Sequence, residues 1–369
     1  MRISFLLPNF SHVPIGGYKV VYEYANRLQS RGHQVYVVQA PRVRTDVSVR
    51  AHLQAWKTYW RRLGHGPHSF RPSWASLHPN VRLLWRPSFA PVWIPDADVV
   101  IATAWHTAEW VARYPASKGT PCYFIQHLET WSGGDPERVR ATWRLPLHKI
   151  VIAKWLQDYA VSLGETAAYV PNGRDPSEFG VDRPSALRNP KHVGMMVHSA
   201  PWKGTEDGLK ALNLVRQGEN GVTVTLFGAE PSPAAVPPWA SYVYNPERAQ
   251  LRQIYNDIAI FLGPSWTEGW GLPPMEAALS GAALAVTDIG GHREYAEHLK
   301  TALLSPVGDS EALAQNVLRL IRDTALRLGL AERALAACQK FDWNESVILL
   351  ENELILARDR NIRARLKAP

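Results

Sequence analysis

Apolar runs alternate with helical patterns from the first residues of the chain. Residues 2–8 (RISFLLP) form an apolar run that predicts a strand, and 9–19, which contain a glycine pair, predict a loop. Residues 20–32 carry apolar side chains at helical spacing and end at a glycine, and 33–39 form a second apolar run. A strand, a helix and a strand in this order predict a βαβ unit and therefore a parallel sheet.

The same alternation continues along the rest of the chain. Further strands are predicted at 97–103, 121–126, 148–153, 167–171, 191–197, 222–228, 258–264 and 283–288. Helical patterns such as 204–218 and 248–257 lie between them, and the run at 167–171 is expected to open a second set of strands. Two such sets predict an α/β protein with two doubly wound Rossmann-like domains.

A cluster of proline, asparagine and glycine at 169–179 predicts the domain boundary. The amino-terminal domain is expected to span 1–170 and the carboxyl-terminal domain 171–345, with 346–369 as a terminal helix that crosses back to the first domain. Ligands of such sheets lie beyond the carboxyl ends of the strands, so we expect the site in the cleft between the domains.

The composition narrows the class of protein. The 369 residues are 46% hydrophobic and 20% charged, which is typical of a globular protein of about two domains. Cys122 and Cys338 have no metal-site spacing, and neither a secretory signal nor a run of about 18 apolar residues occurs, so we expect a cytoplasmic protein. The net charge of +8 and the pI near 9.5 favour anionic partners in general.

The segment GPSWTEGWGLPPMEAALSGAALAVTDIGG (263–291) carries the candidate chemistry. Gly269 and Gly271 let a backbone approach a ligand closely, and Pro273 and Pro274 suit the first turn of a helix. Because free N–H groups at a helix start bind anions, we expect this loop to hold a phosphate.

Glu268 and Glu276 flank this loop. Carboxylates accept hydrogen bonds from hydroxyl groups, so two of them around a phosphate site predict a ligand with a sugar on one side and a ribose on the other. In the alternative interpretation, Glu276 only complements the helix dipole and Glu268 is a surface loop residue.

Residues 42–72 contain seven Lys or Arg and one Asp, with Leu53, Trp56, Trp60 and Leu63 at helical spacing. A basic amphipathic helix is therefore predicted. It could contact a membrane surface, which suits a lipid-linked acceptor, or pack on its own domain with a solvated basic face. The usual nucleic-acid-binding motifs do not occur, so we expect no nucleic-acid partner.

These motifs resemble the retaining nucleotide-sugar glycosyltransferases of the GT-B fold, family four in the sequence classification, over nearly the whole chain. The most specific part is EGWGLPPMEA, which is similar to the EGFGLPPLEA box of that family. The donor-binding residues implied in this box are Glu268, Gly269, Trp270, Gly271, Leu272, Pro273 and Glu276. Glu268 would contact hydroxyls of the donor sugar, and Glu276 those of the ribose.

Other motifs extend the resemblance. IGGYKVV resembles the amino-terminal glycine loop, which implies that Gly16 and Gly17 lie near the diphosphate and the acceptor. YFIQHLETW resembles a strand that ends in a sugar-contacting histidine, here His127. Tyr18 and His106 are further candidates for the acceptor side, although His106 could simply cap the following helix.

One departure from the family concerns the diphosphate. The Lys-Gly pair of the family falls on Lys203 and Gly204, but the position of its arginine is His198, which lacks the guanidinium fork and is only partly charged near neutral pH. Some subgroups, including bacterial rhamnosyltransferase-like members, also depart here.

The resemblance implies a retaining hexosyltransferase that uses a nucleotide-sugar donor and needs no metal or other cofactor. Glu268, Lys203 and His127 are the expected catalytic residues. The expected acceptor is a glycan or a lipid-linked sugar of cell-surface polysaccharide biosynthesis, at the inner face of the membrane. The alternatives are a catalytically silent sugar-nucleotide-binding or scaffold subunit, and a GT-B enzyme of another kind such as a sugar-nucleotide epimerase.

Overall fold

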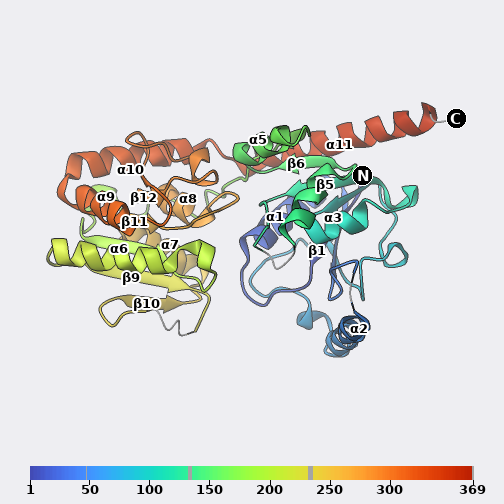
Figure 1. The fold of residues 1–369 in the computed structure, drawn as a ribbon, viewed down its shortest axis with the longest axis horizontal. Coiled ribbons are helices and arrows are strands. Elements are labelled where there is room, and N and C mark those ends of the chain that lie inside the picture. The colour runs from blue at the N-terminus through green and yellow to red at the C-terminus, as the bar shows by residue number, and fades with distance from the viewer. Residues whose placement is uncertain (47, 132–134, 232–235, 368–369) are drawn as a thin grey trace. The chain divides into compact units, whose positions relative to one another are not determined.

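The computed structural model describes residues 1–46, 48–131, 135–231 and 236–367 (Figure 1). The chain divides into two compact units, one formed by 1–172 with 344–369 and the other by 173–343. Each unit contains one parallel sheet with helices between its strands, so the predicted α/β class with two Rossmann-like sheets is confirmed. In the part of the chain that the structure describes, no helix combines the length and apolarity that a membrane crossing needs.

The amino-terminal unit has a seven-stranded sheet in the order β3-β2-β1-β4-β5-β6-β7. Its helices and strands are β1 (Arg2–Pro8), α1 (Gly16–Ser30), β2 (Gln34–Ala40), α2 (Val49–Gly64), β3 (Arg82–Trp85), β4 (Val99–Ala102), α3 (Trp105–Val111), β5 (Thr120–Ile125), α4 (Pro136–Ala141), β6 (His148–Val151), α5 (Lys154–Ser162), β7 (Ala167–Tyr169) and α11 (Trp343–Lys367). Helix α11 is held to this unit by Glu351, which pairs with Arg31 and, at 2.6 Å, with Nε2 of His33.

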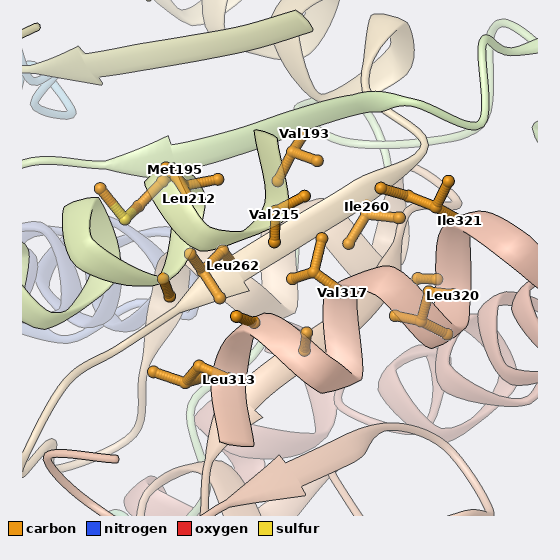
Figure 2. Packing of buried hydrophobic residues seen from close by; sticks show 14 of the residues in the cluster. Val193, Met195, Leu212, Val215, Ile260, Leu262, Leu313, Val317, Leu320 and Ile321 are labelled. Carbon is orange, nitrogen blue, oxygen red and sulfur yellow. The ribbon is translucent and has the colours of Figure 1, made fainter. Parts of the chain in front are cut away.

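The carboxyl-terminal unit has a six-stranded sheet in the order β10-β9-β8-β11-β12-β13. Its elements are β8 (His192–Met196), α6 (Thr205–Gly218), β9 (Thr223–Gly228), β10 (Ser241–Tyr244), α7 (Arg248–Asp257), β11 (Ile260–Gly263), α8 (Leu272–Leu279), β12 (Ala283–Thr287), β13 (Leu303–Ser305), α9 (Ser310–Arg322) and α10 (Thr324–Gln339). Figure 2 shows Met195 and Leu262 of the sheet packed with Leu212 of α6 and Val317 of α9. Because the inner strands of this sheet are largely buried, they read as the continuous apolar runs seen in the sequence.

Two expectations about the elements are wrong. The run at 167–171 does not open the second set of strands, because β7 pairs with β6 of the first sheet, where Ala167 lies opposite Lys149. Helix α1 begins at Gly16 rather than at residue 20, because the carbonyl of the extended residue Ile15 accepts the backbone N–H groups of Tyr18 and Lys19. The glycine pair therefore forms the first turn of a helix and not a loop.

Candidate active site

The loop 264–271 joins β11 to α8 at the carboxyl end of the strand. Gly271 begins the helix with φ of +86°, a conformation that favours glycine. A Cβ atom there would lie 2.7 Å from Cδ2 of His292 and 2.8 Å from the hydroxyl of Tyr295. That hydroxyl donates a 2.6 Å hydrogen bond to the Gly271 carbonyl, so a buried tyrosine fixes the start of α8.

The start of α8 offers an anion fewer donors than the sequence suggested. Pro273 and Pro274 have no N–H group, and the amide of Met275 is directed at the Gly271 carbonyl at 3.5 Å. Among the first three residues of the helix, only Leu272 carries an amide proton. The helix dipole and this amide therefore need a charged side chain beside them to hold a diphosphate firmly.

Lys203 supplies that charge. Its Nζ lies 2.8 Å from Oε1 and 3.0 Å from Oε2 of Glu268, and the Ser265 hydroxyl donates a 2.9 Å hydrogen bond to Oε1. Burial raises the pKa of Glu268, but the Lys203 ammonium, with His292 and Ser265, outweighs burial and holds the pKa below its usual value. Two predicted site residues from distant parts of the sequence therefore form an ion pair.

Gly204 explains how Lys203 reaches this loop. Gly204 has φ of +64°, and a Cβ atom on it would lie 2.0 Å from the carbonyl oxygen of Pro264. Only a glycine lets the start of α6 approach the loop after β11 so closely. The Trp266 amide donates to the Trp202 carbonyl at 2.7 Å, which joins the same two segments a second time.

Glu276 lies one turn into α8 and is partly buried. The hydroxyl of Tyr255, which is buried, lies 3.1 Å from Oε2 of Glu276. Burial and then the Glu276 charge raise the pKa of Tyr255 well above its usual value, so the tyrosine remains a donor. A carboxylate oriented in this way can accept hydrogen bonds from paired hydroxyls of a ligand.

His198 is exposed after β8, at the position where the resembling family has an arginine. Its Nδ1 accepts the Ala200 amide at 2.9 Å, so the proton of the neutral ring is on Nε2. Partial burial of the ring and then the Lys203 charge lower the pKa of His198. At this position the site therefore offers an imidazole N–H group where the resembling family has a guanidinium group.

Trp270 and Gly269 are placed differently from the rest of the motif. The Trp270 residue is 2% exposed, with its indole N–H directed at the Met275 sulfur at 2.9 Å and its ring edge-on to Phe341 at 4.8 Å. The side chain is thus part of the core, and only backbone atoms of Trp270 and of the buried Gly269 are left to approach a ligand.

In the amino-terminal unit, Gly16 and Gly17 lie at the start of α1, and the Gln126 side chain after β5 donates to the Gly17 carbonyl at 3.1 Å. Tyr18 donates its hydroxyl to the carbonyl of Pro8 at the end of β1. The glycine turn is therefore fixed against the carboxyl ends of two strands.

His127 lies just beyond β5, at the same edge of the sheet. Its Nδ1 accepts two hydrogen bonds, from the Glu129 amide and the Trp131 indole, both at 3.1 Å. A nitrogen that accepts from two donors carries no proton, so the neutral ring is protonated on Nε2. Nε2 is therefore the hydrogen-bond donor of the neutral His127 ring.

Glu129 is the candidate that the sequence did not reveal. It has φ of +60°, which is uncommon for a residue with a long side chain, and its Oε2 accepts the Trp105 amide at 2.8 Å. The residue is partly exposed, but its carboxyl group is enclosed, and this burial raises the pKa to about 7 in spite of the Trp105 hydrogen bond. Burial, followed by Tyr22 and the charge of Glu129, raises the pKa of Tyr18.

His106 does not join this group. Its ring stacks on Trp105 at 3.9 Å, and its Nδ1 is buried without a hydrogen-bond partner. Burial, followed by Arg44, lowers the pKa of His106 to about 4, and its other charged neighbours are Glu109 and Arg138. The two acceptor-side candidates, His106 and Tyr18, therefore have different surroundings.

Within the described residues, no three His, Cys, Asp or Glu side chains are grouped so as to hold a metal ion. In the carboxyl-terminal unit, the candidate groups for ligand binding are the Lys203 ammonium, the carboxylates of Glu268 and Glu276, the His198 ring and the start of α8.

Comparison with known proteins finds a family match for part of the chain. The sequence model described as glycosyl transferases group 1 matches residues 191–323. An N,N'-diacetylbacillosaminyl-diphospho-undecaprenol alpha-1,3-N-acetylgalactosaminyltransferase of Campylobacter jejuni is 26% identical over 157 residues, 42% of each chain. A lipopolysaccharide core biosynthesis mannosyltransferase of Rhizobium leguminosarum is 33% identical over 22% of this chain and 23% of its own. The matches thus span less than half the length of these relatives.

Solved structures share the fold over nearly the whole chain. HepE of Anabaena, in complex with UDP and glucose, is 18% identical with a TM-score of 0.71, covering 96% of this chain and 99% of its own. Sucrose-phosphate synthase of Thermosynechococcus elongatus is 13% identical with a TM-score of 0.70, covering 99% of both chains. The segment that matches the model described as glycosyl transferases group 1, residues 191–323, includes the loop that carries Glu268 and Glu276.

Proposed function

We propose that this protein transfers a hexose from a nucleoside diphosphate sugar to an acceptor hydroxyl, with retention of the anomeric configuration. The observation that carries the proposal is the ion pair of Lys203 and Glu268 beside the start of α8, within the segment that matches the group 1 family. This arrangement puts a cation for a diphosphate next to a carboxylate for sugar hydroxyls.

In this proposal the protein stabilises the charge that develops on the leaving group. As the bond between the sugar and the diphosphate breaks, negative charge gathers on the phosphate oxygens, and fixed positive groups lower the barrier most at that point. The Lys203 ammonium has three N–H groups, so it can contact a phosphate oxygen while it still holds Glu268. The dipole of α8 and the N–H group of His198 act on the same diphosphate.

The carboxylates and the acceptor complete the reaction. Glu268 accepts hydrogen bonds from the donor sugar and Glu276 from the ribose. The anomeric carbon loses its bond to the diphosphate oxygen and gains one to the acceptor oxygen, and the acceptor proton passes to the departing diphosphate. The scheme uses no protein nucleophile, metal ion or cofactor. The family match favours this transfer over a silent binding subunit or an epimerase.

The acceptor in this proposal is a glycan or a lipid-linked sugar of cell-surface polysaccharide synthesis, used on the cytoplasmic side of the membrane. The description of the Campylobacter jejuni relative, which names a sugar on diphospho-undecaprenol, supports this class of acceptor. His127, which donates through Nε2, the enclosed carboxyl group of Glu129 and Tyr18 of α1 are the proposed acceptor-side groups of the amino-terminal unit.

A thermal-shift titration with UDP, GDP and dTDP tests the donor site. We expect one nucleotide to stabilise the wild type by about 2.7 kcal/mol at a hundred times its dissociation constant. Glu276→Ala should lose this effect, whereas Glu247→Ala, which removes an exposed carboxylate elsewhere in the same unit, should keep it. If no nucleotide stabilises the protein, the proposal is refuted. If a nucleotide binds but no nucleotide sugar is turned over, the catalytically silent binding subunit becomes the favoured function.

A further inference from the structure

Helix α2 presents an apolar stripe to solvent. Val49, Leu53, Trp60 and Leu63 are 77%, 62%, 60% and 41% exposed. At 3.6 residues per turn these four positions fall within an arc of about 80° on the helix surface. Scattered apolar side chains are normal on a protein surface, but a continuous stripe of four large ones indicates a contact site.

The helix packs on its own unit through a different face. Ala55 is buried, and the carbonyl of Tyr59 accepts the Trp85 indole N–H at 3.2 Å. The Arg62 guanidinium lies over the rings of Phe10 and Trp85, at 4.6 and 5.3 Å from their centroids. Packing on its own domain therefore accounts for one side of α2 and leaves the apolar stripe uncovered.

A stripe of cations runs beside the apolar one. Arg50, Lys57 and Arg61 are exposed, and their helical positions centre about 100° round the helix from the apolar stripe. The sequence has no Asp or Glu from residue 47 to residue 95. The exposed face of α2 is therefore apolar on one side and positively charged on the other.

The short helix η2 (Pro91–Trp93) enlarges this surface. Val92 is 79% exposed and Trp93 37% exposed, and the Trp93 ring lies edge-on to Trp56 of α2 at 6.2 Å. A shallow open hollow on α2 is lined by Ser48, Arg50, Ala51, Leu53, Gln54 and Lys57. The hollow thus joins two cations to an apolar side chain.

The segment before α2 is anchored firmly. Arg138 donates to both carboxylate oxygens of Glu109, at 2.5 and 2.6 Å, and also pairs with Asp46. Thr45 donates a further hydrogen bond to Glu109 at 2.8 Å. Hydrogen bonds from Arg138 and Arg44 hold the pKa of Asp46 well below its usual value, so this network stays ionised near neutral pH. The residues that precede α2 are therefore tied to Glu109 of α3 and Arg138 of α4.

We propose that α2 and η2 form a docking surface for a lipid bilayer that contains anionic phospholipid. The apolar stripe would enter the boundary between headgroups and acyl chains, and the cationic stripe would contact lipid phosphates. We choose an anionic membrane as the partner because of charge complementarity. Cationic side chains lie beside the apolar stripe, and the 49 residues from 47 to 95 contain no Asp or Glu. Figure 1 shows α2 at the periphery of its unit.

Co-sedimentation with lipid vesicles tests this proposal without any assay of catalysis. We expect the wild type to sediment with phosphatidylcholine vesicles that contain phosphatidylglycerol, less as salt rises, and hardly at all with pure phosphatidylcholine. Leu53→Ser with Trp60→Ser should lower the partition coefficient at least about tenfold. Val161→Ser with Leu187→Ser, which alters side chains of 65% and 67% exposure outside α2, is the matched control and should bind like the wild type.

A second pair of substitutions separates the contribution of the cationic stripe to vesicle binding from that of the apolar stripe. Arg50→Gln with Lys57→Gln should remove the preference for phosphatidylglycerol and the dependence on salt. The proposal is overturned if the wild type stays in the supernatant with anionic vesicles at low salt, or if the Leu53 and Trp60 variant binds like its control. Sedimentation velocity tests whether a second copy of the chain occupies this surface instead. If the wild type is a dimer that does not bind vesicles, and the Leu53 and Trp60 variant is a monomer, the surface is a dimer interface. Circular dichroism verifies that every variant is folded.

Discussion

Replacing Lys203 by methionine tests the ion pair at the centre of the proposed site. The substitution keeps most of the side-chain length but removes the charge that lies 2.8 and 3.0 Å from the Glu268 oxygens. The side chains of Lys203 and Glu268 are 21% and 13% exposed, so Glu268 would be left largely buried with the Ser265 hydroxyl beside it. An uncompensated buried charge is strongly destabilising, whereas an exposed pair contributes little.

For a pair of this intermediate burial we expect Lys203→Met to lower the free energy of unfolding by about 2 kcal/mol. In a unit of this size that corresponds to a fall of about 4–8 °C in the melting temperature, which differential scanning fluorimetry resolves. Loss of one charge-assisted contact to the diphosphate should also weaken nucleotide binding about 30-fold, measured by isothermal titration calorimetry.

A double variant, Lys203→Met with Glu268→Gln, separates the effect of the ion pair on stability from the effect of Lys203 on nucleotide binding. The double variant has no unpaired charge, so its melting temperature should return to within about 3 °C of the wild type, because isosteric replacement of both partners is close to neutral. Its nucleotide affinity should stay low. A Lys203→Met protein with wild-type stability would contradict the ion pair, and one with wild-type nucleotide affinity would contradict the donor site.

Three further predictions follow from single residues. Burial raises the pKa of Glu129 to about 7, above the ordinary 4.5, so ionisation of its carboxyl group destabilises the folded protein as pH rises from about 4.5 to about 7. The free energy of unfolding of Glu129→Gln, relative to that of the wild type, should therefore increase by about 1–3 kcal/mol from pH 5 to pH 8 in urea titrations. An equal difference at both pH values would contradict this. Gly204→Ala should cost about 3 kcal/mol or more, since its Cβ would lie 2.0 Å from the Pro264 carbonyl, whereas Gly64→Ala, with nothing within 4 Å, should melt close to the wild type. His198→Arg should bind the nucleoside diphosphate about tenfold more tightly in calorimetry, and unchanged affinity would place the diphosphate away from this position.

Strands in the middle of each sheet could be predicted from sequence because their side chains are buried. Such strands read as continuous apolar runs, as β4 and β12 do. The strands that the sequence did not predict, β3, β10 and β13, all lie at the edges of the two sheets. The remaining edge strand, β7, was recognised but assigned to the wrong set. Edge strands are short and mostly half-buried, so their sequences lack the apolar signal.

Parts of the candidate site could also be predicted from the sequence, and other parts could not. The loop between β11 and α8 could be predicted, because glycine and proline act locally and leave a pattern in the sequence. Trp270 could not be placed, since its burial depends on Phe341, which lies 71 residues further along the chain. Glu129 was missed because its positive φ and enclosed carboxyl group arise from tertiary packing, which brings the carboxylate to the Trp105 amide at the start of α3. A polar residue just beyond a predicted strand end was the one signal that could have indicated it.

Release of nucleoside diphosphate from nucleotide sugars tests the central claim most directly. Purified protein would be incubated with UDP-, GDP- and dTDP-sugars, with and without added glycan and lipid-linked acceptors, and the products identified by mass spectrometry. The account predicts that one donor loses its sugar with formation of a glycoside, and that Lys203→Met reduces the rate at least a hundredfold. A folded protein that binds a nucleotide but turns over none of these donors, or a Lys203→Met variant as active as the wild type, would contradict it.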